Sequence, residues 1–207
     1  MERRAIRAVC GLGNPGEEYA QTRHNLGFMV LERVAAEVGA RVSRKEAQAR
    51  TSGIANAWGS EVLLFKPQTF MNLSGASVKL IAAKYEIDPV EILIVCDDAD
   101  LPFGRLRIRG SGGAGGHRGL ESIIAAIGKD FPRLRLGMSN EYRERRIRDF
   151  VLDRFTKEEQ TALEAFLSTA VDAVHSIVKD GLHAAMNRFN RPAPVQDAPP
   201  PDVTPGT

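Results

Sequence analysis

Four short polar segments of the sequence lie beside apolar runs that are typical of buried strands or helices. They are R-H-N at 23–25, K-P-Q-T-F-M-N at 66–72, D-D-A-D at 97–100 and G-G-H-R at 115–118. Ligands of α/β sheets bind beyond the carboxyl ends of the strands, so these segments and the turn at 11–16 are predicted to meet at one edge. The side chains brought there are Asn14, His24, Asn72, Asp97 and His117.

These residue types indicate a particular chemistry. A histidine and a carboxylate supply a general base and the partner that orients it, and two carboxamides supply neutral donors for an oxyanion or a peptide backbone. The sequence has no G-x-S-x-G nucleophile elbow and no His/Cys/Asp spacing typical of zinc. We therefore predict attack by water with help from a base, without a covalent intermediate, a metal or a cofactor. This chemistry suffices for an ester, whose alcohol leaves more readily than an amine.

Other chemically capable residues allow simpler interpretations. Cys10 and Cys96 end strand-like runs and are predicted to be small core residues. The aspartates of D-D-A-D could cap a turn or bind Mg²⁺, although no phosphate-cradling loop of the Walker kind accompanies them. His117 is predicted to be structural rather than catalytic. Asn72 could be only the N-cap of the helix that follows it.

The stretch G-L-G-N-P-G, Gly11 to Gly16, has the G-x-G-x-x-G spacing of a dinucleotide-binding turn. Such a site needs a helix that starts at the turn and an acidic residue at the end of the next strand. Here the apolar periodicity begins only near Leu26, and the acids at the right distance, Glu32 and Glu37, lie inside that helix. The motif is therefore predicted to be a strand-to-loop turn that carries Asn14 into a site.

The elements that position these residues follow from hydrophobic periodicity. Strands are predicted at 5–11, 51–57, 61–66, 91–96, 105–109 and 133–138, and helices at 26–38, 73–85, 117–127, after a Thr156–Glu159 capping box, and at 181–189. Strands that alternate with helices predict an α/β fold, a single-domain three-layer sandwich with a mixed, mostly parallel central sheet flanked by helices. One catalytic domain is predicted over 1–190, with a disordered proline-rich tail over 191–207.

Composition places the chain among ordinary globular proteins. It has 207 residues, of which 43% are hydrophobic and 26% charged, and a net charge of +2. No apolar run is long enough to span a membrane, and the start lacks the apolar region of a signal peptide. With only two cysteines, a reducing cytoplasm is the expected location. No coiled-coil pattern argues for assembly, so a monomer without an obligate protein partner is expected.

Positive charge is concentrated in one segment. Residues 105–148 hold eleven Lys and Arg against four acids. This segment is either a solvated surface or a face that meets phosphates. In R-L-R-I-R and R-L-R-L-G, period two places the arginines opposite the apolar residues, so Arg109 and Arg135 are predicted to reach solvent together. The glycine-rich loop at 110–116 is either a flexible connector or a backbone that approaches a phosphate or ribose.

Taken in order, four motifs carry a resemblance. They are G-L-G-N-P-G-x-x-Y-x-x-T-R-H-N-x-G, F-M-N-L-S-G, D-D-x-D-L-P-x-G and G-G-x-G-G-H-x-G-L. Together they resemble the bacterial peptidyl-tRNA hydrolase family, and the match covers nearly all of the chain except the tail. The resemblance implies an enzyme that cleaves the ester between a peptide and the terminal ribose of tRNA, and so peptidyl-tRNA as its partner.

The resemblance also implies roles for individual residues. His24 matches the base, Asp97 the carboxylate that holds it, and Asn14 and Asn72 the amides that grip the substrate. Tyr19 and Met71 match residues that line the cleft, and Arg109 and Arg135 a clamp for the tRNA end phosphate. His117 and Arg118 complete the substrate-binding set, although many relatives have Asn where this chain has Arg118.

Two other functions stay open at this stage. Some relatives of the family are thought to serve RNA splicing, so a non-catalytic RNA-binding protein on the same fold is one alternative. A dinucleotide-dependent oxidoreductase is the other. An intact set of His24, Asp97, Asn14 and Asn72 beside the arginine clamp favours the hydrolase over the RNA-binding protein. Absence of a fluorescence or thermal-shift response to NAD(H) or NADP(H) would exclude the oxidoreductase.

Overall fold

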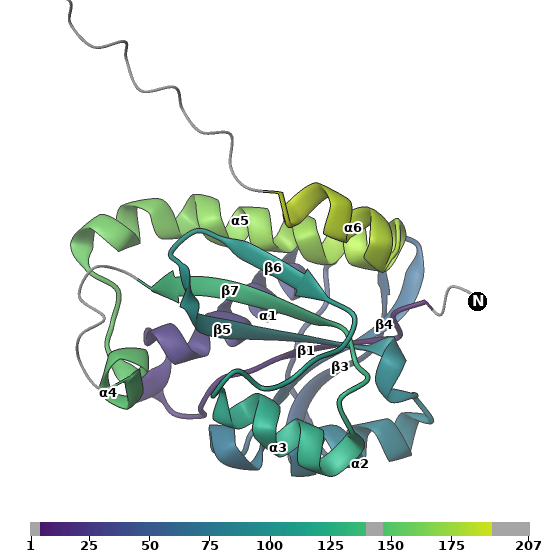
Figure 1. Cartoon of the computed structure of the whole chain (residues 1–207). Helices are drawn as coiled ribbons and strands as arrows, with labels where there is room; N and C mark the ends of the chain where they lie inside the picture. The colour runs from purple at the N-terminus through teal and green to yellow at the C-terminus, as the bar shows by residue number, and fades with distance from the viewer. Residues whose placement is uncertain (1–4, 140–146, 192–207) are drawn as a thin grey trace, which may run out of the picture.

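The computed structural model describes residues 5–139 and 147–191. Its centre is a seven-stranded sheet with the order β2-β3-β4-β1-β5-β7-β6 (Figure 1). The strands are β1 (Ala8–Gly11), β2 (Arg44–Glu46), β3 (Ala49–Ala57), β4 (Ser60–Pro67), β5 (Ile92–Pro102), β6 (Leu106–Arg109) and β7 (Arg133–Ser139). The central strands β4, β1, β5 and β7 are parallel, while β2, β3 and β6 pair antiparallel at the two edges.

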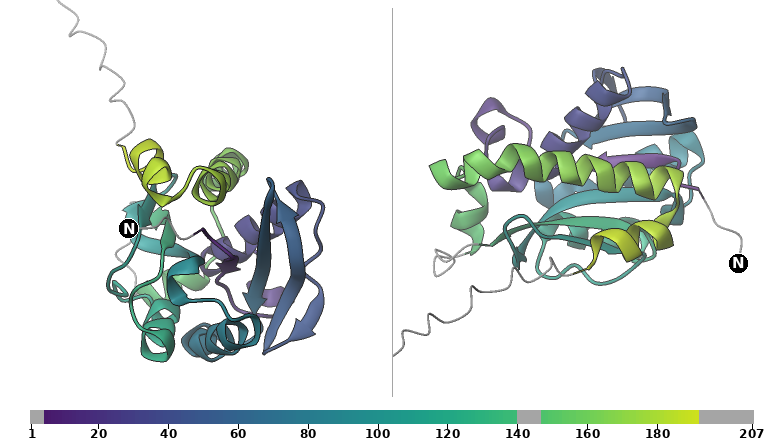
Figure 2. Two further views of the ribbon diagram at one scale, coloured as in Figure 1. Left: turned by 90° about the vertical axis from the view of Figure 1, so that its right-hand side faces the viewer. Right: turned by 90° about the horizontal axis from the view of Figure 1, so that it is seen from above.

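Helices cover both faces of this sheet, as the two views of Figure 2 show. The helices are α1 (Leu26–Glu37), α2 (Ser74–Tyr85), α3 (Arg118–Ile127), α4 (Ile147–Leu152), α5 (Lys157–Lys179) and α6 (Leu182–Phe189). Four short 3₁₀ helices lie in the described connections: η1 (Glu17–Tyr19), η2 (Arg23–Asn25), η3 (Met71–Leu73) and η4 (Pro89–Glu91), of which η2 and η3 lead directly into α1 and α2. Helices α1, α5 and α6 lie on one face, and α2 and α3 on the other (Figure 1).

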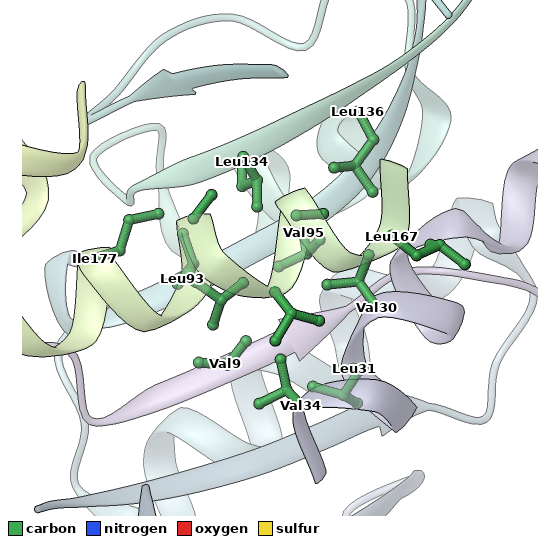
Figure 3. Close-up of a cluster of buried hydrophobic side chains, with 14 of the residues drawn as sticks. Val9, Val30, Leu31, Val34, Leu93, Val95, Leu134, Leu136, Leu167 and Ile177 are labelled. Carbon is green, nitrogen blue, oxygen red and sulfur yellow. The ribbon is translucent and has the colours of Figure 1, made fainter. Parts of the chain in front are cut away.

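Strand alternation divides the core into two layers. On β5, Leu93 and Val95 face α1 and α5, and the residues between them face α2 and α3. The first layer is drawn in Figure 3, where Val30 of α1 and Leu167 of α5 meet the sheet. Because both faces of the central strands are buried, these strands read as continuous apolar runs in the sequence.

The predicted fold class is confirmed, and the predicted elements are present with small shifts of their ends. The expectation that a strand ends at Cys96 is wrong, because β5 continues through D-D-A-D to Pro102 with an irregularity in its pairing to β7. Strand β2 and helix α4 had no predicted counterpart, since each is too short to show a period. The tail predicted from 191 lies, beyond Arg191, outside the described residues.

The glycines of the N-terminal turn permit close packing of α1 against the sheet. A Cβ on Gly11 would lie 2.3 Å from the carbonyl oxygen of Gly27, and one on Gly27 would lie 2.4 Å from the carbonyl oxygen of Val95. Helix α1 begins at Leu26 and not at the turn, as the sequence predicted. The G-x-G spacing thus serves helix–strand contact, and the geometry of a dinucleotide site is lacking.

A buried ion pair fixes the segment that carries His24. The guanidinium of Arg23 contacts the carboxylate of Glu159 at 2.6 Å, and both side chains are nearly inaccessible to water. Arg23 also donates to the backbone oxygen of Arg154 and lies over the rings of Phe150 and Phe155. Glu159 closes the predicted capping box with Thr156 at the start of α5. The loop before α1 is therefore fastened to α4 and α5.

Within the described residues, none of the helices has both the length and the apolar character that crossing a membrane requires.

We expect Glu159→Gln to lower the free energy of unfolding by about 3–5 kcal/mol, because it leaves the Arg23 charge buried without a counter-ion. Glutamine has nearly the size of glutamate and keeps an oxygen that accepts from the Thr156 backbone N–H. The change in unfolding free energy therefore reports the effect of the charge. Urea unfolding measures it. Glu164→Gln, which removes the exposed partner of Arg33, is the matched control and is expected to change little. Equal stability of the two variants would contradict this role of the pair.

Candidate active site

An open cleft of about 470 Å³ lies at the carboxyl edge of the parallel strands. It is lined by Asn14, His24, Phe70, Met71, Asn72, Asp97, Asp98, Ala99, Asp100, Gly115, Gly116, His117, Arg118, Arg135, Val151 and Leu152. The five polar side chains that the sequence predicted at one edge are all among them. The structure thus brings together residues of strand β5 and of three connections, β1–α1, β4–α2 and β6–α3, which are far apart in the chain.

His24 and Asp97 form the centre of the cleft. Nδ1 of His24 lies 2.9 and 3.0 Å from the two carboxylate oxygens of Asp97, so this nitrogen donates its proton to the carboxylate. His24 is supplied by η2 and Asp97 by β5, and both side chains are buried. With Nδ1 occupied, Nε2 is the ring atom left to accept a proton from a molecule in the cleft.

Opposing effects set the ionisation of this pair. Burial by itself would lower the pKa of His24, but the charge of Asp97 and the hydrogen bond to it prevail and raise that pKa above its ordinary value. Burial would raise the pKa of Asp97, but attraction to His24 and His117 and the hydrogen bonds from both rings lower it below its ordinary range. Asp97 is therefore a carboxylate under all ordinary conditions.

Asn14 is held in one orientation by its neighbours. The side chain of Asn25 accepts from the Asn14 backbone N–H at 2.8 Å and donates to its carbonyl oxygen at 3.0 Å. The Oδ1 atom of Asn14 accepts from the backbone N–H of Met71 at 2.8 Å. Because Oδ1 is engaged, the amide nitrogen of Asn14 is the group left to donate into the cleft.

Asn72 and His117 occupy positions that the sequence did not settle. The view of Asn72 as the N-cap of α2 is wrong, because Asn72 lies within η3 and Leu73 precedes α2. Its exposed side chain lines the cleft instead. His117 is the N-cap of α3, where Nδ1 accepts from the backbone N–H groups of Gly119 and Leu120. Its Nε2 lies 3.0 Å from Asp97 Oδ1.

Arg135 and Asp98 form an ion pair next to the His24–Asp97 pair. Nε of Arg135 is 2.9 Å from Oδ2 of Asp98, and neither atom makes a hydrogen bond of good geometry. The two charges therefore attract one another while the guanidinium keeps donors for a further group. The terminal nitrogen of Arg135 also packs so closely on Gly115 that a Cβ there would lie 2.7 Å from it. Arg118 adds a second cation at the N-terminus of α3.

The glycine-rich loop is held in place by a buried arginine that the sequence analysis did not single out. Arg133 donates to the carbonyl oxygens of Gly112 and Gly113 at 2.6 and 3.2 Å, and its guanidinium lies over the ring of Phe131. The loop is therefore not a free connector. Period two alone suggested that this arginine is exposed, but the glycine-rich loop and residues 129–131 cover it.

Two residues of the predicted set lie outside the cleft lining. Tyr19 stabilises the loop that precedes α1, because its carbonyl oxygen accepts hydrogen bonds from the backbone N–H and the hydroxyl of Thr22. Arg109 is exposed on the edge strand β6. The expectation that Arg109 and Arg135 reach solvent together is wrong, because Asp98 and Gly115 partly bury Arg135. The register pairs Arg109 with Arg133 and Arg107 with Arg135, so all four lie on one face.

Sequence reasoning missed the supporting residues. Arg23 and Asn25 belong to the R-H-N segment, but their partners Glu159 and Asn14 are distant in sequence, and only the fold reveals these contacts. Phe70 and Leu152 give the cleft an exposed apolar rim that no local pattern distinguished.

Cys10 and Cys96 are both buried, and burial raises the pKa of each thiol. Neither lines the cleft, so the part of the chain that the structure describes offers no cysteine nucleophile there.

Within the described ranges, a single group of side chains has metal-ligand spacing: His24, Asp97 and His117, whose ligand atoms lie within 4.8 Å of one another. In the hydrogen-bonded arrangement both ring nitrogens that face Asp97 carry protons. A metal would have to displace both protons, and the hydrogen bonds already account for the geometry.

Comparison with known proteins identifies the family. The sequence profile of Peptidyl-tRNA hydrolase matches residues 8–197. The chain belongs to the peptidyl-tRNA hydrolase family. The peptidyl-tRNA hydrolase of Desulforudis audaxviator is 46% identical over 89% of this chain and 93% of its own. That of Chloroflexus aurantiacus is 46% identical over 88% and 97%.

Solved structures agree with this assignment. The crystal structure of peptidyl-tRNA hydrolase from Acinetobacter baumannii superposes with a TM-score of 0.85 at 36% identity, covering 92% of this chain and 97% of that one. As a member of the peptidyl-tRNA hydrolase family, this protein is a hydrolase that acts on an ester bond.

We expect Asp97→Asn to move the acid limb of the pH–rate profile to lower pH and to lower the maximal rate roughly tenfold or more. A general base must be neutral, so activity falls as the pH drops through the pKa of His24. The charge of Asp97 raises that pKa, and without it burial lowers the pKa and weakens the base. The measurement is kcat/KM against pH. Asp172→Asn, on an exposed position of α5, is the control, and an unchanged profile for Asp97→Asn would contradict the role of Asp97.

Proposed function

We propose that this protein hydrolyses the ester that joins a peptide to the terminal ribose of tRNA, without a metal or other cofactor, and so frees the tRNA for reuse. The single observation that carries the proposal is the contact between His24 Nδ1 and Asp97, which leaves Nε2 of a buried histidine as a base at the cleft. The family assignment supports the substrate class.

The chemical step needs only groups that line the cleft. Nε2 of His24 takes a proton from a water molecule while the water oxygen bonds to the ester carbonyl carbon. The carbonyl oxygen becomes an oxyanion, and the amide nitrogens of Asn14 and Asn72 are the donors within reach of it. When the carbon–oxygen bond to the ribose breaks, the proton on His24 passes to the leaving ribose oxygen. The carboxylate of Asp97 stabilises the imidazolium between the two steps.

The lining of the cleft offers groups that suit both halves of this substrate. Phe70, Met71, Val151 and Leu152 offer apolar surface for the side chains of a peptide. Arg118 at the start of α3 and Arg135 on β7 line the same cleft, where a phosphate near the 3′ end can accept their hydrogen bonds. Arg109 extends this positive face along β6 toward the body of the tRNA.

All of these groups come from one chain, which supports a monomer that acts without an obligate protein partner. Two free, buried cysteines fit the reducing cytoplasm as its location. A non-catalytic RNA-binding protein would share the basic face, but it has no need of a buried imidazole–carboxylate pair.

We expect His24→Ala to lower single-turnover hydrolysis of N-blocked aminoacyl-tRNA by about 10²–10⁴-fold while binding of the tRNA changes little, since general base catalysis contributes about that factor. Release of free tRNA is measured with pre-folded substrate in the presence of EDTA. His183→Ala, on an exposed position of α6, is the control. A wild-type rate for His24→Ala would sink the assignment of the base, and loss of wild-type activity in EDTA would refute metal independence.

We expect Arg109→Ala to raise KM and flatten its salt dependence, with kcat at saturation within a few-fold of wild type. Each phosphate contact adds close to one unit to the log–log salt slope, somewhat less for a single strand. Full-length substrate and a minimal ester without the tRNA body are compared across a salt series. Arg188→Ala, exposed on α6, controls for net charge. Equal losses on both substrates would show that Arg109 acts at the reaction centre or in folding.

A further inference from the structure

His117 makes two contacts that together define the state of its ring. Its Nδ1 accepts from the backbone N–H groups of Gly119 at 3.1 Å and Leu120 at 3.2 Å, at the start of α3. Its Nε2 lies 3.0 Å from Oδ1 of Asp97. Two donors point at Nδ1, so that atom has no proton and the ring is held in the tautomer that carries it on Nε2. His117 is thus a fixed donor to Asp97.

Asp97 depends on this donor. Its carboxylate is almost wholly buried, and a buried charge is tolerated only when hydrogen bonds satisfy it. Oδ1 accepts from His117 as well as from His24, whereas Oδ2 accepts from His24. The two rings are neighbours, with their centroids 5.1 Å apart, and both contact Oδ1. The hydrogen bond from His117 therefore stabilises part of the negative charge of Asp97. Without that bond, the charge would act on His24 alone.

We propose that His117 is a positioning residue: it anchors the N-terminus of α3 and, through Asp97, sets the orientation and protonation of His24. The proposal deepens the function proposed above and rests on it for the role of His24. The glycine-rich loop lines the cleft and ends at His117, where α3 begins. One side chain therefore links the position of this loop to the state of His24. The sequence predicted a structural or substrate-binding role for His117. Its two contacts give it both a structural role at α3 and an effect on the protonation of His24.

Other charged groups face the same cleft and bear on how His24 titrates. They are Asp98 and Asp100 on β5, Arg118 on α3 and Arg135 on β7. Asp98 forms an ion pair with Arg135, and Arg23 forms one with Glu159. Among the described residues, His117 is the one further side chain that is hydrogen-bonded to the His24–Asp97 pair.

Two substitutions separate the two contacts of His117. In His117→Asn the side-chain oxygen takes the place of Nδ1, so the helix keeps an excellent N-cap, but the chain is too short to reach Asp97. In His117→Gln the amide nitrogen takes the place of Nε2, so the donor to Asp97 is kept while the cap is weakened. Titration of the His24 ring by NMR and urea unfolding are measured for both, with His183→Asn as the control.

For His117→Asn we expect a urea midpoint near wild type and a His24 titration midpoint about half a pH unit higher. The direction follows because Asp97, freed of one donor, attracts the proton on His24 more strongly. The acid limb of kcat/KM moves the same way. For His117→Gln we expect the reverse pattern, a lower urea midpoint and a His24 titration restored toward wild type.

The proposal is overturned if His117→Asn leaves the His24 titration unchanged, or if His117→Gln shifts it as far as His117→Asn does. Should the asparagine variant fail to fold, His117→Gln still decides, because a His24 titration far from wild type would refute the role of the donor. The NMR readout needs no substrate. If it behaves as expected and wild-type protein fails to release tRNA, the proposed function is wrong while the coupling through His117 stands.

Discussion

The carboxylate of Asp97 is the constraint on which the rest of the site depends. An ion this deeply buried is stable only with several donors, and two imidazoles supply them. That requirement fixes where η2 and the N-terminus of α3 must lie relative to β5. The same carboxylate raises the pKa of His24, so one interaction sets both the architecture of the cleft and the chemistry available in it.

Packing of the backbone makes this contact possible. His24 reaches β5 only because α1 approaches the sheet closely, and Gly11 and Gly27 leave no room for a Cβ at that crossing. The Arg23–Glu159 pair then fixes the same segment from the opposite side, against α5. Contacts with the sheet and with α5 thus hold the segment that carries His24.

The arginines of β6 and β7 differ in their surroundings. Arg133 is buried and organises the glycine-rich loop, Arg135 lies in the cleft beside Asp98, and Arg109 is exposed on the edge strand. All three come from short strands in which arginines alternate with apolar residues, and period two alone treats them alike. Their exposure differs because the glycine-rich loop covers Arg133 and packs on Arg135 but leaves Arg109 of β6 open.

The sequence by itself determined the fold class, most elements and the residue types at the cleft. These depend on local periodicity and on chemistry that each strand end carries, as the runs around Val95 and the capping box at Thr156 show. It did not determine the extension of β5 past Cys96, the buried state of Arg133, or the dual contact of His117. Such features depend on pairs far apart in the chain, as His24 and Asp97 are, and on what covers a strand face. Only the tertiary structure decided them, because burial and hydrogen-bond partners are properties of the packed molecule and not of a local pattern.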